Sequence, residues 1–186
     1  MTLGGVIGGS QALSTATIGQ TGNRAASIAV NDLRAADTVS LAATGAVGQD
    51  TADGGVDVAA AGLTVAAGTG IDLDTNVTDL TAANSTSVSV RVDEADALNV
   101  LNLTNANGPI TLTTAAAGNV AVTNLNAGSG SVTVWLADGD LTSETSDPGT
   151  PDIVGGDMSL TIQATCKRPI LHSAIGADPN LEPPLR

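Results

Sequence analysis

The sequence contains no phenylalanine and no tyrosine, and Trp135 is its only tryptophan. Globular domains normally use aromatic side chains to fill the irregular volume of their core. The apolar residues, 42% of the chain, are therefore almost all alanine, valine, leucine and isoleucine. Side chains of this kind suit a narrow, regular interior made of stacked layers, so the composition argues against an ordinary globular domain.

Cysteine and positive charge are scarce as well. A single cysteine, Cys166, excludes an internal disulfide framework and any multi-cysteine metal site. The 19 acidic residues outnumber the 6 lysines and arginines and give a formal net charge of −13. A surface of this sign repels nucleic acids and anionic membranes, so we expect neither a nucleic acid partner nor membrane insertion.

Long hydrophobic runs are missing too. No apolar stretch reaches the roughly 18 residues that a membrane-spanning helix needs. Residues 1–5 show neither the basic start nor the continuous apolar segment of a secretory signal peptide. Export of the protein would require a signal outside this sequence, and we expect the chain to be a fragment of a longer protein.

The residues that the chain does have in abundance favour turns and short strands. Most of the acids are aspartates, and glycine occurs 22 times. Aspartate favours turns and ligates hard cations, whereas glutamate mainly favours helices. The composition therefore predicts an all-β chain with frequent turns and leaves calcium binding open.

Segments of alternating apolar and polar residues recur along the chain. The triplets at 88–90, 110–112 and 132–134 start 22 residues apart, and the spacing becomes slightly longer toward the N-terminus. Companion residues keep the same step: Leu98, Val100 and Leu103 correspond to Val120, Val122 and Leu125. A second column, in which Asp or Asn precedes a leucine, is expected to mark a corner and comprises Asp32, Asp79, Asn102 and Asn124.

One such repeat cannot bury its own apolar side chains, but stacked repeats bury them against each other and pair their backbone groups. We therefore predict a single-stranded parallel β-helix, a solenoid of about 22–25 residues per coil, with the right-handed crossover that parallel strands favour. Residues 27–162 are expected to form the solenoid repeats. Residues 1–26 are expected to form a degenerate N-terminal coil or cap, and residues 163–186 an atypical C-terminal tail or cap.

The stretches at 54–58, 68–73 and 124–134 resemble the repeats of the large filamentous-haemagglutinin-type exoproteins of bacteria. The resemblance covers residues 27–162 and lies in the style and period of the repeat. It implies a right-handed parallel β-helix, export by a dedicated secretion route, and an elongated stalk that serves adhesion or biofilm formation. It carries over no catalytic residue.

Two pairs of aspartates are candidate calcium ligands. Asp72 and Asp74, and likewise Asp138 and Asp140, are two residues apart, so the carboxylates of a pair point to the same side of an extended segment. Ordinary turn aspartates are the alternative interpretation, because the tandem period of calcium-binding glycine- and aspartate-rich repeats is missing.

An acidic cluster beside an arginine is the feature that favours an enzyme. Glycan lyases and hydrolases also use parallel β-helices, and Arg91 is followed by Asp93, Glu94 and Asp96, which are expected to lie in one turn. Sugar sites usually need aromatic platforms, and charge clusters are usually solvated surface. The sequence therefore predicts a chain without a catalytic site.

The polar centres of the triplets form a column of hydroxyl side chains that is expected to face outward. A flat hydroxyl surface is a candidate binding face for ice or a crystalline polymer, although Arg91 and Trp135 interrupt the neighbouring column. An exposed tryptophan is also a candidate anchor for a partner. The predicted surface-binding residues are Ser40, Thr64, Ser89, Thr111, Thr133 and Trp135.

Together these features predict a non-enzymatic structural or adhesive segment of a secreted or surface-displayed bacterial protein. We expect it to continue into further repeats of a longer chain and to contact host or neighbouring-cell surfaces or glycans. No cofactor is expected, apart from the calcium considered above. The alternative functions are a glycan-active β-helix enzyme and a hydroxyl-face binder of ice or a crystalline polymer.

Overall fold

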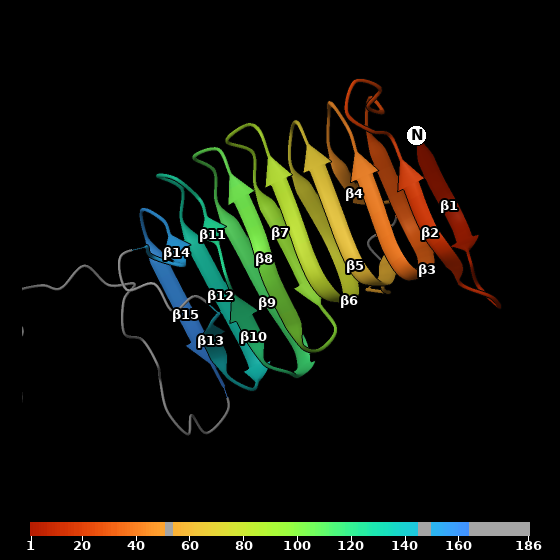
Figure 1. Ribbon diagram of the computed structural model, residues 1–186. Helices are drawn as coiled ribbons and strands as arrows, with labels where there is room; N and C mark the ends of the chain where they lie inside the picture. Colours follow the sequence, from red (N-terminus) through yellow and green to blue (C-terminus); the bar gives the residue numbers. More distant parts are fainter. Residues whose placement is uncertain (51–53, 145–149, 164–186) are drawn as a thin grey trace, which may run out of the picture.

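The computed structural model describes residues 1–50, 54–144 and 150–163, which form one sheet of 15 strands wound into a parallel β-solenoid of about 7 turns. Figure 1 shows the coils stacked in chain order from β1 at one end to β15 at the other. The predicted all-β solenoid is confirmed. Among the described residues there is no helix, and so none that is long and apolar enough to cross a membrane.

The alternation of apolar and polar residues explains why these segments form strands with one inward and one outward side. In β12 (Val132–Asp138), for example, the buried Val132, Val134 and Leu136 alternate with the partly exposed Thr133 and Trp135. Side chains of consecutive strand residues point to opposite faces, so each coil contributes one row of aliphatic side chains to the interior.

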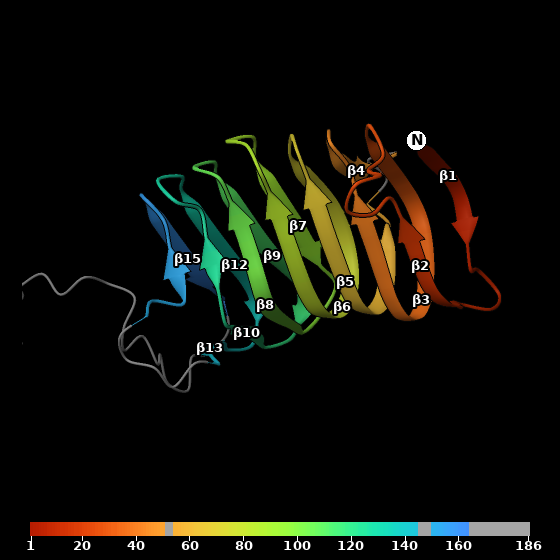
Figure 2. The same cartoon turned by 45° about the horizontal axis from the view of Figure 1, so that its top comes forward.

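One face of the solenoid, here called face A, follows the strand order β1-β3-β4-β6-β7-β9-β12-β15. β3 and β6 are long and bend around into the opposite face (Figure 2). Besides β12, the strands that contribute to face A are β1 (Thr2–Ile7), β3 (Ile28–Ala42), β4 (Val47–Gln49), β6 (Ile71–Asn84), β7 (Val90–Glu94), β9 (Ile110–Ala117) and β15 (Met158–Ile162).

The opposite face, here called face B, is built from the second half of each coil. It includes the C-terminal parts of β3 and β6, which pair with the strands before and after them. The other strands of face B are β2 (Leu13–Ile18), β5 (Val58–Ala67), β8 (Leu98–Asn105), β10 (Val120–Val122), β11 (Leu125–Asn126), β13 (Leu141–Ser143) and β14 (Ile153–Val154).

Inward-facing side chains stack in columns that run the whole length of the solenoid, about 4.8 Å apart at each step. The stacked aliphatic residues form one continuous hydrophobic core. The Ile7 column consists of Ile7, Leu33, Val58, Thr75, Glu94, Thr114, Leu136 and Ile162. The Ile18 column on face B consists of Ile18, Leu41, Val65, Ala82, Leu103, Leu125 and Ile153.

The spacing of the coils is less regular than the sequence pattern predicts. The predicted stacking of Leu98, Val100 and Leu103 on Val120, Val122 and Leu125 is confirmed. Elsewhere the step between stacked residues varies, from a short one between Leu63 and Leu80 to a long one between Leu125 and Ile153. The turns between strands absorb these differences in length.

The predicted alignment of the triplet at 88–90 with that at 110–112 is wrong by two residues. Val90, rather than Val88, stacks on Ile110, and Val88 lies exposed in the preceding turn. The predicted corner column is also only partly correct. Asn124 Nδ2 donates to Asn102 Oδ1 of the preceding coil at 2.7 Å, whereas Asp79 aligns with Asn99 instead.

The N-terminal residues form a first coil, because β1 and β2 both pair in parallel with β3. Register shifts in both strands make this coil irregular. The predicted tail at 163–186 lies outside the described residues except for Gln163. The Gln163 N–H donates to the Leu136 carbonyl at 3.0 Å and so extends the ladder of β15.

Candidate functional site

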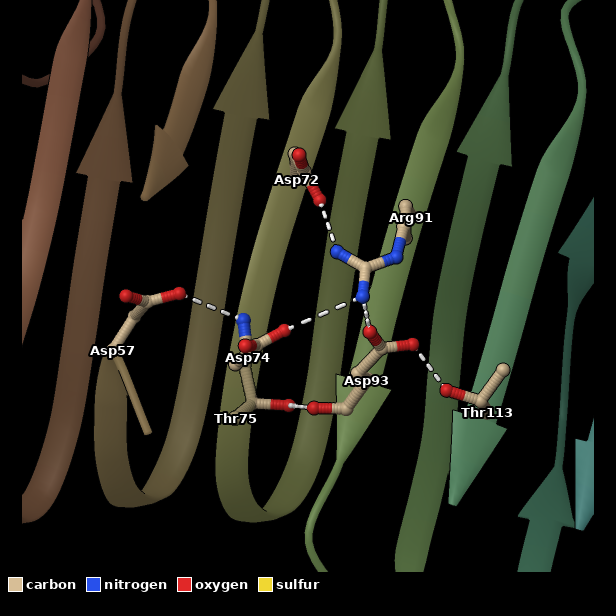
Figure 3. A network of polar contacts seen from close by, with 7 residues as sticks. All are labelled: Asp57, Asp72, Asp74, Thr75, Arg91, Asp93 and Thr113. Atoms are coloured by element: carbon tan, nitrogen blue, oxygen red, sulfur yellow. Dashed lines mark hydrogen bonds and ion pairs between the residues drawn. The ribbon is translucent and has the colours of Figure 1, made fainter. Parts of the chain in front are cut away.

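A cluster of charged side chains on face A is centred on Arg91 of β7 (Figure 3). Arg91 follows the buried Val90, so the strand alternation turns its side chain outward, as predicted. Its Nη1 donates to Asp72 Oδ1 at 2.7 Å, and its Nη2 lies 3.8 Å from Asp74 Oδ1. Nη2 also forms an ion pair with Asp93. Because Asp72 and Asp74 belong to β6, the guanidinium joins two consecutive coils.

Hydrogen bonds extend this cluster to the coils on either side. The Thr113 hydroxyl of β9 donates to the Asp93 carboxylate. On the other side, the Asp74 N–H donates to Asp57 Oδ2 at 2.8 Å, and Asp57 is buried. Asp74, Asp93 and Thr113 follow one another in the register of face A. The Arg91 network therefore links four consecutive coils.

The charges of the Arg91 network determine what it can do chemically. An arginine side chain stays protonated in proteins, and here its donors already face carboxylates of Asp72, Asp74 and Asp93. The excess of carboxylates makes this part of face A acidic, which repels anionic polysaccharides. This geometry favours a cross-coil contact that stabilises the solenoid over a catalytic arginine.

Glu94, the last residue of β7, points into the solenoid and is 0% exposed. Its carboxylate accepts hydrogen bonds from the Thr75 hydroxyl at 2.8 Å, the Val77 N–H at 3.2 Å and the Ala95 N–H at 2.9 Å. Burial raises the pKa of Glu94, and these hydrogen bonds, foremost that from Thr75, offset only part of the rise. Glu94 is thus a titratable group held within the Ile7 column.

The prediction that Asp93, Glu94 and Asp96 lie together in an exposed turn is wrong. Asp93 faces outward and contacts Arg91, whereas Glu94 faces the core and Asp96 is exposed beyond the end of β7. The strand simply continues through residue 94, and adjacent strand residues point to opposite faces. Asp93 and Glu94 therefore cannot act as a pair of carboxylates on one glycosidic bond.

The two predicted calcium pairs have different surroundings. Asp72 and Asp74 point to the same side of β6, as expected, but the cation between them is the Arg91 guanidinium. Asp138 and Asp140 are exposed, and Asp138 Oδ1 accepts the N–H of the intervening Gly139 at 2.8 Å. Within residues 1–50, 54–144 and 150–163, no group of three or more His, Cys, Asp or Glu side chains could hold a metal ion.

Gly139, between the second pair of aspartates, is required by the close stacking of coils. Its φ is 109°, in the region that favours glycine, and a Cβ there would lie 2.3 Å from the Gly118 carbonyl oxygen. Asp140 N–H donates to Asn119 Oδ1 of the preceding coil at 2.9 Å. These contacts account for the Asp-Gly-Asp sequence as a tight turn.

The predicted column of hydroxyl side chains is divided between the two faces. Thr111 and Thr133 are neighbours on face A, whereas Ser40 and Thr64 are neighbours on face B. Ser89 is exposed in the turn before β7 and belongs to neither ladder. The single continuous column is wrong because the change in coil length between residues 64 and 111 moves the triplets from one face to the other.

Trp135 lies on face A with its side chain outward and partly exposed. In the register it stands between Thr113 of β9 and Thr161 of β15. Together with Thr111 and Thr133, it forms an uncharged part of face A next to the Arg91 network. These three predicted surface-binding residues lie together on face A, whereas the predicted Ser40 and Thr64 lie together on face B.

Two buried asparagines, Asn84 and Asn105, were not predicted to have a role. Asn84 Nδ2 donates to Asn105 Oδ1 at 2.9 Å and to the Val88 carbonyl at 2.9 Å, and Asn105 Nδ2 donates to the Pro109 carbonyl at 2.9 Å. They hold the turns that lead into β7 and β9. A polar residue two positions after a buried aliphatic one, as after Ala82 and Leu103, is the sequence signal that would have found them.

Comparison of the chain with known proteins gives no match. No protein-family model, no curated protein and no solved structure matches the chain.

Proposed function

We propose that the chain is a structural and adhesive segment of a larger secreted or surface-displayed bacterial protein, and that it has no catalytic activity. The observation that carries this proposal is the unbroken stack of coils. The Ile7 and Ile18 columns continue from the first coil to the last, and the Ile18 column is aliphatic throughout, so the solenoid forms a continuous rod. Such a rod suits a stalk or a scaffold that holds a binding surface away from a cell.

The use of polar side chains on the surface supports a structural role. Besides the Arg91 network, Asn99 Nδ2 donates to Asp79 Oδ1 of the preceding coil at 2.9 Å, and Ser14 Oγ donates to Asp37 Oδ2 at 2.8 Å. These contacts connect coils to each other. A catalytic site would instead keep its acid, base and arginine available to a substrate.

The resemblance to filamentous-haemagglutinin-type exoproteins supports the placement outside the cell, at the bacterial surface or in the medium, and the continuation into further repeats. The partners we propose are surfaces or glycans of host or neighbouring cells. The uncharged part of face A, formed by Thr111, Thr133 and Trp135, is the region that we propose makes this contact. The function requires no cofactor.

Adhesion of coated beads tests the proposal. Beads that carry the purified chain at graded densities are applied to cell monolayers and to immobilised glycans, and retention under flow is measured. We expect retention to rise steeply with density, because many weak contacts act together. Trp135→Ala should reduce retention severalfold, whereas Thr64→Ala, which changes an exposed residue on face B, should leave it unchanged.

Two outcomes would contradict the proposal. Retention no greater than that of beads coated with an unrelated acidic protein would exclude the adhesive role. Cleavage of acidic polysaccharides that is lost in Asp93→Asn would establish the glycan-active alternative, because Asp93 is the outward carboxylate that contacts Arg91.

A further inference from the structure

The outward residues of face A form straight columns along the solenoid, and one of these columns joins the Arg91 network to Trp135. Asp74 and Asp93 of this column are drawn in Figure 3. The column, here called the Asp74 column, consists of Asp74, Asp93, Thr113, Trp135 and Thr161, which pair in this order. Its four steps of one coil spacing span about 19 Å. Carboxylates and an indole ring therefore lie in one line along the solenoid.

A second column of outward residues runs beside the Asp74 column and carries hydroxyl groups next to Trp135. It consists of Asp72, Arg91, Thr111, Thr133 and Ser159, which pair in this order. Face A therefore has an acidic half around Arg91 and a half in which hydroxyl groups surround an aromatic ring. A surface of the second kind fits a ligand that has both hydroxyl groups and an apolar face. The pyranose ring of a sugar has both.

The acidic half of face A has more carboxylates than cations. Asp72, Asp74 and Asp93 share one guanidinium, that of Arg91. Asp72 is the most accessible of the three acids, with 54% of its side chain exposed, against 17% for Asp74 and 24% for Asp93. This half of face A therefore keeps a negative charge beside Arg91, and charge complementarity favours a cationic ligand.

The negative charge continues along the solenoid toward the N-terminus. Asp32 and Asp57 directly precede members of the Ile7 column in the two coils before β6. Asp50 is exposed beside β1. The basic residues of this region are Arg34, which pairs with Asp32, and Arg24, which lies between β2 and β3. The acids outnumber the bases, so the electrostatic field along this part of the solenoid attracts cations.

Trp135 favours a ligand that combines sugar rings with positive charge. An indole is the aromatic ring that attracts cations most strongly, and its flat apolar surface also packs against the apolar face of a sugar ring. Trp135 lies two coil steps from Asp93 in the Asp74 column, which is about 9.6 Å. A pyranose unit of an extended polysaccharide is about as long as one coil step. A chain that lies along the column thus places one ring on Trp135 and a nearby ammonium group at Asp93.

We propose that face A binds a linear amino-sugar polysaccharide, a polymer of glucosamine-type units with free ammonium groups, which lies along the Asp74 column. Trp135 packs against one sugar ring, and Thr111 and Thr133 form hydrogen bonds with its hydroxyl groups. Asp72 and Asp93 bind ammonium groups of neighbouring units through charge-assisted hydrogen bonds. The inference rests on the adhesive function proposed above and names the class of glycan that the same surface recognises. Anionic polysaccharides are excluded because the carboxylates repel them.

The fluorescence of Trp135 reports on this site alone, because the chain contains no other tryptophan and no tyrosine. A glucosamine hexamer is titrated into the full chain, and the fully N-acetylated hexamer and a galacturonic acid hexamer are titrated for comparison. We expect a saturable change in emission with the glucosamine hexamer, roughly tenfold weaker binding of the N-acetylated hexamer, and no binding of the galacturonic acid hexamer. Added salt should weaken the binding of the glucosamine hexamer.

Calorimetric titration extends the test to variants. Trp135→Ala should weaken binding of the glucosamine hexamer roughly tenfold. Asp93→Asn should weaken binding of the glucosamine hexamer and leave binding of the N-acetylated hexamer unchanged, because only the first ligand carries ammonium groups. The matched control is Asp79→Asn, which removes the same charge from face B, where Asp79 accepts a hydrogen bond from Asn99 of the next coil. Circular dichroism confirms that each variant folds.

Equal weakening by Asp93→Asn and Asp79→Asn would overturn the proposal, because the hexamer would then respond to net charge alone. Unchanged affinity in Trp135→Ala would overturn it as well, and so would hexalysine that binds with the same affinity and the same dependence on Trp135. Retention of coated beads on cells without binding of the glucosamine hexamer would overturn this inference and leave the adhesive function standing. Binding of the hexamer at Trp135 without retention on cells would support this inference and contradict the adhesive function.

Discussion

Arg91 shows how one basic side chain stabilises part of a strongly acidic surface. Its guanidinium contacts Asp72, Asp74 and Asp93, and the last two are largely shielded from solvent. Arg91→Ala removes these charge-assisted contacts and leaves the carboxylates to repel each other. We expect the free energy of unfolding to fall by about 2 kcal/mol, measured by urea denaturation.

Arg34→Ala is the matched control for Arg91→Ala. Arg34 pairs with Asp32, two residues away on the same strand, and so joins no coils. Because Arg34 is exposed to solvent, its loss should leave the free energy of unfolding nearly unchanged. Equal destabilisation by Arg91→Ala and Arg34→Ala would show that the cross-coil contact contributes nothing.

Millimolar calcium should raise the melting temperature of the Arg91→Ala variant, because its carboxylates then lack the arginine cation. The melting temperature of the unmodified chain should not change with calcium.

Glu94 gives the solenoid a pH dependence opposite to that of most carboxylates. Burial raises its pKa above the ordinary value of about 4.5, so the folded protein holds this proton more tightly than the unfolded chain does. The stability from this group is complete below the unfolded-state pKa and is lost as the pH rises through the folded-state pKa. Stability from Glu94 therefore falls, rather than rises, as the pH is raised from the acid side.

Glu94→Gln keeps a neutral side chain of the same shape at every pH. Relative to the unmodified chain, we expect its free energy of unfolding to increase as the pH rises from 4 to 7, because only the unmodified chain then buries a charge. Urea denaturation at a series of pH values measures the difference. Parallel pH curves for the two proteins would mean that Glu94 does not change its charge over this range.

At the level of the strand, the register of β7 decides which residues are buried. Val90 is 1% exposed and Val88 is 46% exposed, although both stand in the same apolar-polar triplet. Val90→Ala should therefore cost about 2–3 kcal/mol of unfolding free energy, and Val88→Ala less than about 0.5 kcal/mol. If Val88→Ala instead proved the more destabilising substitution, residue 88 rather than residue 90 would be the one stacked on Ile110, as the sequence pattern predicts.

The sequence predicts the fold better than it predicts the register. The repeat step of the sequence pattern is correct between Leu98 and Val120 because no insertion interrupts the chain there. It fails between Val90 and Ile110, since strand alternation alone cannot tell which of two apolar residues two positions apart begins the strand. Because side chains alternate with a period of two, only the length of the preceding turn settles the choice, and turn lengths vary freely on a surface.

The same limit explains the errors at the candidate site. Asp93 and Glu94 are adjacent acids, and composition alone places both on the surface, where charged residues normally lie. Glu94 turns inward only because β7 extends as far as residue 94. There the Thr75 hydroxyl and two backbone N–H groups donate hydrogen bonds to its carboxylate. Asn84 and Asn105 likewise occupy inward positions that an aliphatic residue usually fills. Such buried polar positions depend on contacts with the next coil, which is distant in the sequence.

For the whole molecule, stability is distributed along the rod. Each coil contacts only the coils before and after it, so the total is approximately a sum of coil and interface contributions. No single cluster holds the fold together, and the Ile7 and Ile18 columns can lose one layer without losing their continuity. The length of the rod is therefore adjustable in whole coils.

Deletion of one coil tests this description of the molecule. Removing residues 99–120 joins Leu98 to Ala121, and since Leu98 stacks on Val120, every following residue keeps its inward or outward position. We expect a β-rich circular-dichroism spectrum and a cooperative melt at a modestly lower temperature. Removing only residues 99–109 instead puts Ile110 in the outward place of Asn99 and reverses the faces that follow, so the cooperative melt should be lost. If the two shortened chains melt alike, the stacked columns do not determine the stability of the solenoid.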